Sequence, residues 1–212
     1  MGDGARAGEK VDPVAPAVRR MRRADRRTQI LDAATRAFSR TGFAATGLDQ
    51  IAAEASITRV LLYRHFDSKA DLYGAVLDRA CRRLEDSVGS DDFDEQAIPA
   101  LLSAAAADPD AFRLLFRHAA REPEFRGRMN VLTAASVDIA RRNLATRIPD
   151  GPWLDWAARL IPTLTIEAVI AWLDAGQPDP DRAPDRISRA VHGVVHAAYT
   201  EEPGTEAPTP SP

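Results

Sequence analysis

Apolar residues recur three or four positions apart along almost the whole chain, which is the spacing of amphipathic helices. No segment shows a convincing alternation of apolar and polar residues, the pattern that is typical of a strand. In chain order the predicted helices cover about 24–40, 46–54, 58–66, 68–88, 98–107, 109–121, 124–147, 153–175 and 184–200. The pattern predicts an all-α fold with short helices near the N-terminus and longer ones after them.

The stretch Thr46–Lys69 predicts two short helices joined by a tight turn at Ala55–Ile57. Thr46 and Asp49 have the spacing of a capping box, and Thr58 is a suitable N-cap for the second short helix. Two helices joined in this way suit the DNA major groove, so the pattern predicts a helix-turn-helix domain. The apolar positions expected to face inward are Leu48, Ile51, Ala52, Leu62 and Phe66.

The neighbouring helices have their own end signals. Gly42 follows the first helix, where a left-handed cap is common. Ser68 and Asp71 have capping-box spacing at the start of a helix that we expect to reach about Val88. Pro109 suits the first turn of a helix, whereas Pro162 inside 153–175 is expected to kink that helix.

Composition places the chain among soluble globular proteins. It has 212 residues, 45% of them hydrophobic, and its most apolar long stretch is interrupted by Asp155, Arg159, Pro162 and Glu167. We therefore expect neither a signal peptide nor a membrane span, and a cytoplasmic location. Cys81 is the single cysteine, which excludes a disulfide within one chain.

The charge is divided unevenly along the chain. Residues 1–80 hold 14 basic and 10 acidic residues, and the remainder holds 14 and 21. A positive N-terminal part suits a polyanion such as DNA. We expect a disordered basic arm at 1–22, a helix-turn-helix domain at 23–68, a helical ligand-binding and dimerisation domain at 69–201, and a disordered tail at 202–212. The arginines from the arm into the first helix either solubilise the chain or lie on phosphates or in the minor groove: Arg19, Arg20, Arg22, Arg23, Arg26 and Arg27.

A family resemblance lies in the segment ILDAATRAFSRTGFAATGLDQIAAEASITRVLLYRHFDSKADL. This segment strongly resembles the N-terminal domain of TetR/AcrR-type transcriptional regulators over about residues 26–80, and Leu62–Lys69 is its most specific part. The resemblance implies a helical homodimer that binds a palindromic DNA operator, usually as a repressor released by a small ligand.

The resemblance also implies roles for individual residues. Thr46, Tyr63, His65 and Lys69 are expected to contact phosphates, and Arg59, Val60 and Leu61 to reach base edges. Arginine can bond both acceptors of a guanine, whereas the two aliphatic residues offer only contacts to thymine methyl groups. Packing and internal hydrogen bonding remain the alternatives for Tyr63 and His65. The full predicted DNA-binding set is Thr46, Thr58, Arg59, Val60, Leu61, Tyr63, Arg64, His65 and Lys69.

Three positions depart from the family's habit. Ser56 stands where the turn usually has glycine, and Val60 and Leu61 replace a small residue and a threonine. A serine forced to positive φ costs about 1 kcal/mol relative to glycine. These departures leave an alternative function open, namely a helical protein-interaction module whose helix-turn-helix has lost DNA binding.

The C-terminal half predicts a dimer and an effector site. Helix 153–175 is apolar on nearly all sides, which calls for a partner, and the resemblance assigns it and 184–200 to the homodimer interface. His192 and His196 share a helix face but have no obvious third ligand, so we expect no metal site. We expect no cofactor and no enzymatic activity, since phosphate-loop, nucleophile-elbow and metal motifs are lacking. The candidate lining of a pocket for a small, largely hydrophobic effector is Phe112, Phe116, His118, Met129, Trp156, Thr163 and Thr165.

Overall fold

The computed structural model describes residues 22–89 and 96–199, and all regular structure within these ranges is helical. This confirms the predicted all-α fold. The tail at 202–212 and nearly all of the arm at 1–22 lie outside the described residues. The helices are α1 (Arg23–Ala45), α2 (Leu48–Glu54), α3 (Arg59–Tyr63), α4 (Lys69–Val88), α5 (Ala97–Ala107), α6 (Pro109–Arg113), η1 (Leu114–His118), η2 (Ala119–Arg121), α7 (Arg126–Leu144), α8 (Pro152–Asp174) and α9 (Ala183–Tyr199).

Local end signals place several of these helices where they were predicted. The Thr58 side chain caps α3 by accepting a hydrogen bond from the Leu61 N–H, and Ser68 caps α4 in the same way through the Asp71 N–H. Gly42 interrupts the end of α1 with φ 77°, the positive value that glycine adopts without strain. A Cβ at Gly42 would stand 3.4 Å from the His118 ring.

Two predictions about helix boundaries are wrong. Thr46 and Asp49 do not form a capping box, because the N-cap of α2 is Gly47 and no side chain caps this end. The single helix predicted over 109–121 is divided into an α-helical start, the π-helical turn η1 and the 3₁₀ turn η2. Leu114 and Leu115 of η1 are both buried.

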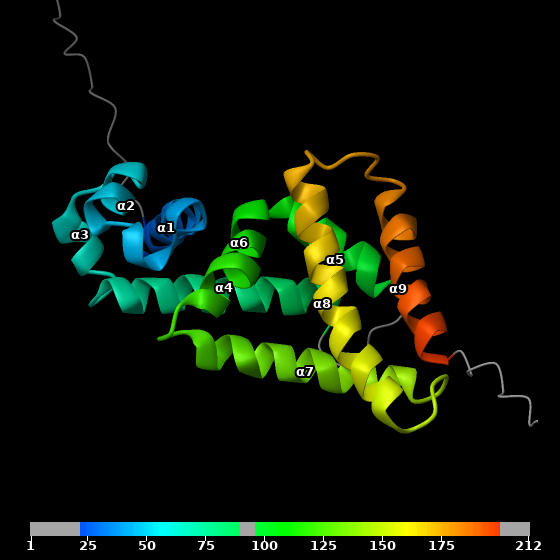
Figure 1. Ribbon diagram of the computed structural model, residues 1–212. Coiled ribbons are helices and arrows are strands. Elements are labelled where there is room, and N and C mark those ends of the chain that lie inside the picture. Colours follow the sequence, from blue (N-terminus) through cyan, green and yellow to red (C-terminus); the bar gives the residue numbers. More distant parts are fainter. Residues whose placement is uncertain (1–21, 90–95, 200–212) are drawn as a thin grey trace, which may run out of the picture.

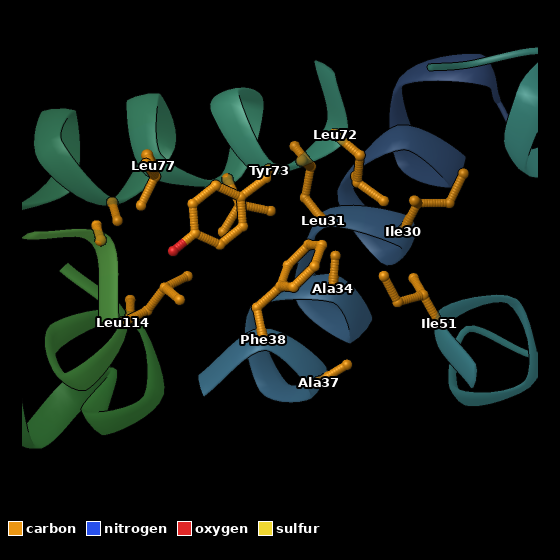
Figure 2. Packing of buried hydrophobic residues seen from close by; sticks show 14 of the residues in the cluster. Ile30, Leu31, Ala34, Ala37, Phe38, Ile51, Leu72, Tyr73, Leu77 and Leu114 are labelled. Atoms are coloured by element: carbon orange, nitrogen blue, oxygen red, sulfur yellow. The ribbon is translucent and has the colours of Figure 1, made fainter. Parts of the chain in front are cut away.

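The N-terminal helices pack around one hydrophobic cluster that continues into the second half of the chain. Figure 2 shows Ile30, Phe38 and Ile51 of the first two helices facing Leu72 and Tyr73 of α4, with Leu114 of η1 closing one side. Tyr73 lies in a group of aromatic rings, at centroid distances of 4.6 Å to Phe125, 4.8 Å to Phe38 and 5.0 Å to Phe43. The cluster therefore crosses the predicted domain boundary at 68/69, and that boundary stays a prediction.

The long helices separate the two ends of the molecule. In Figure 1, α2 and α3 lie at one end, α4 runs away from them, and α8 and α9 lie at the other end. α5 and α6 pack on α8 and α9 through Leu101, Phe112, Val169 and related residues, and α7 joins α8 in a third cluster. α8 is the one helix of the described ranges that is long and apolar enough to cross a membrane.

Part of α8 and α9 remains uncovered. Trp153 is 61% exposed, Trp156 stacks edge-on against it at 5.5 Å, and Tyr199 at the end of α9 is also exposed. Only 28% of the most apolar window of α8 is buried. Large apolar side chains on two adjacent helices are the kind of surface that another protein covers.

Candidate nucleic-acid interface

Hydrogen bonds from α1 and to α2 fix the turn between α2 and α3. Ser56 adopts φ 52°, the positive φ whose cost relative to glycine was considered for this position, and the Ile57 N–H donates to the Ala52 carbonyl at 2.9 Å. From α1, Gln29 donates its side-chain amide to the carbonyl of Ala55 at 2.7 Å. The turn therefore has one strained residue and a direct attachment to the supporting helix.

An ion-pair group fastens the end of α2 to α1. Glu54 accepts from Arg36 at 2.9 Å and pairs with Arg40 through its other oxygen. The hydrogen bond from Arg40 is the main cause that lowers the pKa of the Glu54 carboxyl, which keeps Glu54 ionised. The group orients α2 on its support, so the surface of α3 is presented by a braced pair of helices.

The outward side of α3 gathers most of the predicted DNA-binding residues. Inward, Leu62 is fully buried, and Phe66 just beyond the helix is nearly so. Leu61 and His65 are half-buried at the margin of the surface. The exposed members are Thr58, Arg59, Val60, Tyr63 and Arg64.

The Thr46 hydroxyl is turned into the domain, and its predicted phosphate contact stays a prediction. Thr46 is 1% exposed, and its hydroxyl donates to the Gly42 carbonyl at 2.6 Å and lies 2.8 Å from the Thr41 hydroxyl. The break in α1 at Gly42 leaves a free carbonyl there, which this hydroxyl satisfies. In the free chain, this burial argues against a phosphate contact through the hydroxyl.

The Lys69 side chain also turns toward α1. Its ammonium donates to the carbonyls of Phe43 at 2.7 Å, Thr46 at 3.0 Å and Ala44 at 3.3 Å, and it lies 4.5 Å from the Phe43 ring centroid. An ammonium has three N–H donors, and all three have acceptors here. This geometry argues against the predicted phosphate contact and makes Lys69 the cap of the end of α1.

His65 lies beside basic residues of α1. Burial is the main cause that lowers the pKa of its imidazole, and Arg23, Arg27 and Arg26 add to the effect. Arg27 also donates to the His65 carbonyl at 3.3 Å and lies 4.3 Å from the Phe66 ring centroid. A neutral His65 at neutral pH remains able to hydrogen-bond a phosphate.

The candidate effector-binding residues do not come together in one place. Met129 is buried in the N-terminal cluster, while Phe112 lies in the second cluster with Phe116 4.8 Å away. Trp156 and Thr163 are exposed on α8, and the hydroxyls of Thr163 and Thr165 bond carbonyls of their own helix. Trp156 and Thr163 therefore do not line an interior pocket with the others, because the side of α8 that carries them faces outward.

Two shallow hollows open along α9 instead. One is lined by Arg182, Asp185, Arg186, Ser188, Arg189 and His192, and the other by Arg147, His192, Val195, His196 and Tyr199. Within residues 22–89 and 96–199, no three His, Cys, Asp or Glu residues are grouped as metal ligands would be.

Some residues of the interface were missed from sequence. Asp49 was interpreted as part of a capping box, but its carboxylate accepts from Arg59 of α3 at 2.9 Å. Gln29 and Glu54 hold the turn and α2 against α1 over separations of 14 to 26 residues. Their polar character at half-buried helix positions was the available signal, and it does not identify a partner.

Known proteins are similar to this chain over the same helix-turn-helix region. The family described as bacterial regulatory proteins, tetR family, matches residues 30–76, from within α1 to within α4. The HTH-type transcriptional activator FasR of Mycolicibacterium smegmatis is 31% identical over 196 residues, which cover 85% of this chain and 88% of FasR. The HTH-type transcriptional repressor SCO4008 of Streptomyces coelicolor is 38% identical over 91 residues, or 42% of this chain and 47% of that protein.

A solved structure extends the likeness in fold over most of the chain. A TetR-like transcriptional regulator from Rhodococcus sp. RHA1 superposes with a TM-score of 0.72 over 82% of this chain and 97% of its own, at 23% identity. At that identity the likeness shows the shared arrangement of helices.

Proposed function

Because the chain belongs to the TetR family of bacterial regulatory proteins and is a DNA-binding transcription regulator, we propose that it binds a two-fold symmetric operator as a homodimer. The observation that best supports this proposal is the outward side of α3. Its exposed residues, above the buried Leu62, are Arg59, Val60, Tyr63 and Arg64. A short helix with a basic and aromatic outer surface suits the major groove.

We propose separate roles for the residues of this surface. Arg59 reads a guanine through two parallel hydrogen bonds, while Val60 and Leu61 contact thymine methyl groups. Tyr63, Arg64, His65 and Thr58 hold phosphates, which sets the register of α3 without reading sequence. Thr46 and Lys69 support the domain from inside.

A second copy of the chain is the partner proposed for the uncovered side of α8 and α9. The support is the exposed apolar side chains there, Trp153, Trp156 and Tyr199. The same apolarity that gives α8 the length and hydropathy of a membrane-crossing helix is accounted for when another α8–α9 pair covers it. Two-fold symmetry of the protein then requires an inverted repeat in the DNA. A protein that binds chromosomal DNA works in the cytoplasm.

The proposed effector is a small apolar molecule bound near Phe112 and Phe116. Phe116 packs against both the N-terminal cluster and the cluster of α5 and α8, so a ligand that displaces it would shift one cluster relative to the other. His118 at the end of η1 lies beside Gly42 of α1, which connects this region to the support of the helix-turn-helix. Release of DNA would follow from altered spacing of the two α3 helices.

We propose repression as the direction of regulation, since a dimer seated across a promoter excludes RNA polymerase by its volume. FasR is named an activator and SCO4008 a repressor, and the position of the operator relative to the promoter would distinguish these two outcomes.

Footprinting of the DNA upstream of the protein's own gene tests the proposed binding and its position. We expect a protected inverted repeat that overlaps the promoter at moderate salt. No protection would favour the protein-interaction module instead, and partner binding that survives loss of Arg59 would establish it.

A further inference from the structure

Arg59 is the proposed base reader, and its side chain is held by two neighbours before any DNA is present. Its Nη1 donates to Asp49 Oδ2 at 2.9 Å, and its Nη2 donates to the Tyr63 hydroxyl at 3.3 Å. The guanidinium carbon also lies 5.6 Å from the Tyr63 ring centroid. The three residues come from the first turn of α2 and from successive turns of α3.

Arg59 keeps enough donors for a guanine in this arrangement. A guanidinium has five N–H groups, and the two bonds to Asp49 and Tyr63 leave one N–H on each terminal nitrogen as well as Nε–H. Guanine needs two parallel donors for its O6 and N7 acceptors. The number of donors is therefore sufficient for a guanine while both neighbours stay bonded to Arg59.

Tyr63 connects this arrangement to the DNA backbone. Its hydroxyl oxygen accepts from Arg59, so its own hydrogen is available to a phosphate oxygen. The Tyr63 side chain is exposed on the same outward side as Arg59. A phosphate contact at Tyr63 would thus fix the ring against which Arg59 is held.

We propose that Asp49 and Tyr63 are positioning residues that hold Arg59 for guanine, so that base preference at this pair depends on a carboxylate of α2. The inference rests on the proposed function, because it assigns the source of specificity at the same surface. Without its neighbours, a long arginine side chain with four rotatable bonds would order on binding at an entropic cost.

Asp49 has a second effect that a mere support would lack. The Asp49 side chain is 76% exposed, and its charge lies beside the surface proposed to meet phosphates. It repels the backbone of every DNA sequence, whereas its bond to Arg59 favours only DNA with guanine at the right place. Removal of the charge should therefore raise non-specific affinity and lower base discrimination at the same time.

The test begins with the full-length protein and duplexes selected from a random pool. Affinities are then measured for the selected duplex and for duplexes with each other base at the guanine position, using wild type, Asp49→Asn, Arg59→Ala and the double variant. Asp67→Asn is the matched control, since Asp67 is an exposed acid between α3 and α4 of the same domain. Tyr63→Phe removes the hydroxyl alone.

We expect Asp49→Asn to reduce discrimination for guanine about tenfold and to bind random DNA more tightly than wild type. In the Arg59→Ala background the same change should leave base preference unaltered. Asp67→Asn should raise affinity for all duplexes alike, and Tyr63→Phe should lower both total affinity and discrimination. Unchanged guanine preference in Asp49→Asn would overturn the inference, as would a selected site with no base that depends on Arg59. No enriched duplex for the wild type would instead overturn the proposed function and this inference with it.

Discussion

The ammonium of Lys69 lies 2.7 Å from the carbonyl oxygen of Phe43, so the first residue of α4 caps the last turn of α1. A positive charge at a helix N-terminus is unfavourable toward that helix, and the carbonyls of another helix end compensate for it. The contact joins the support of the helix-turn-helix to the long helix that leads away from it.

Lys69→Met tests the capping role. It should lower the free energy of unfolding by about 1 kcal/mol or more, because three carbonyls lose a charged donor. The salt dependence of DNA binding should keep its slope. Arg64→Met is the matched control, since it removes a charge from the outer surface of α3. That variant should reduce the slope by about one and leave stability unchanged. A reduced slope in Lys69→Met with unaltered stability would instead support the predicted phosphate contact of Lys69.

Ser56→Gly should stabilise the protein by about 0.5–1 kcal/mol, because glycine adopts the φ of 52° without a Cβ clash. Urea denaturation at equilibrium measures the difference. Ala53→Gly is the control on the exposed side of α2, where glycine should destabilise by about 1 kcal/mol. Equal destabilisation by both changes would show that the turn does not strain Ser56.

His65 should make stability fall on acidification. Its pKa lies below the ordinary value of 6.5 in the folded chain, so between these two pKa values the unfolded chain binds more protons. The contribution of His65 is thus present above about pH 6.5 and is lost as pH falls toward the folded-state pKa. The thermal midpoint of the wild type should drop more than that of His65→Gln between about pH 7.5 and about pH 5.5. Equal drops would mean that the imidazole is not shielded.

Trp156→Glu should convert the proposed homodimer to monomers, because a charge would replace an exposed apolar side chain on α8. Val131→Glu is the matched control, as Val131 is 71% exposed on α7. Sedimentation of both variants measures their mass. Retention of the dimer by Trp156→Glu, or its loss in Val131→Glu, would place the interface elsewhere.

Features set by neighbouring residues were predictable from sequence. The caps at Thr58 and Ser68 depend on atoms three residues away. The apolar spacing also identified the inward side of α3. These are local relationships, and short-range patterns contain the information for them.

Features set by contacts between distant residues were not predictable. The ammonium of Lys69 finds its carbonyl acceptors 23 to 26 residues away, and Gln29 of α1 bonds the carbonyl of Ala55 in the turn. The residues predicted to line the effector site lie apart in the structure for the same reason. Spacing identifies the apolar side of α8, but packing decides that Trp156 faces outward while Val169 is buried.

The most direct test of the account is the sequence that the full-length protein selects from a random pool of DNA duplexes. We predict an inverted repeat whose half-sites are centred about one helical turn or a multiple of it apart, each with a guanine whose preference disappears in Arg59→Ala. Enrichment of a single, asymmetric site, or of no sequence at all, would contradict binding by two symmetry-related α3 helices.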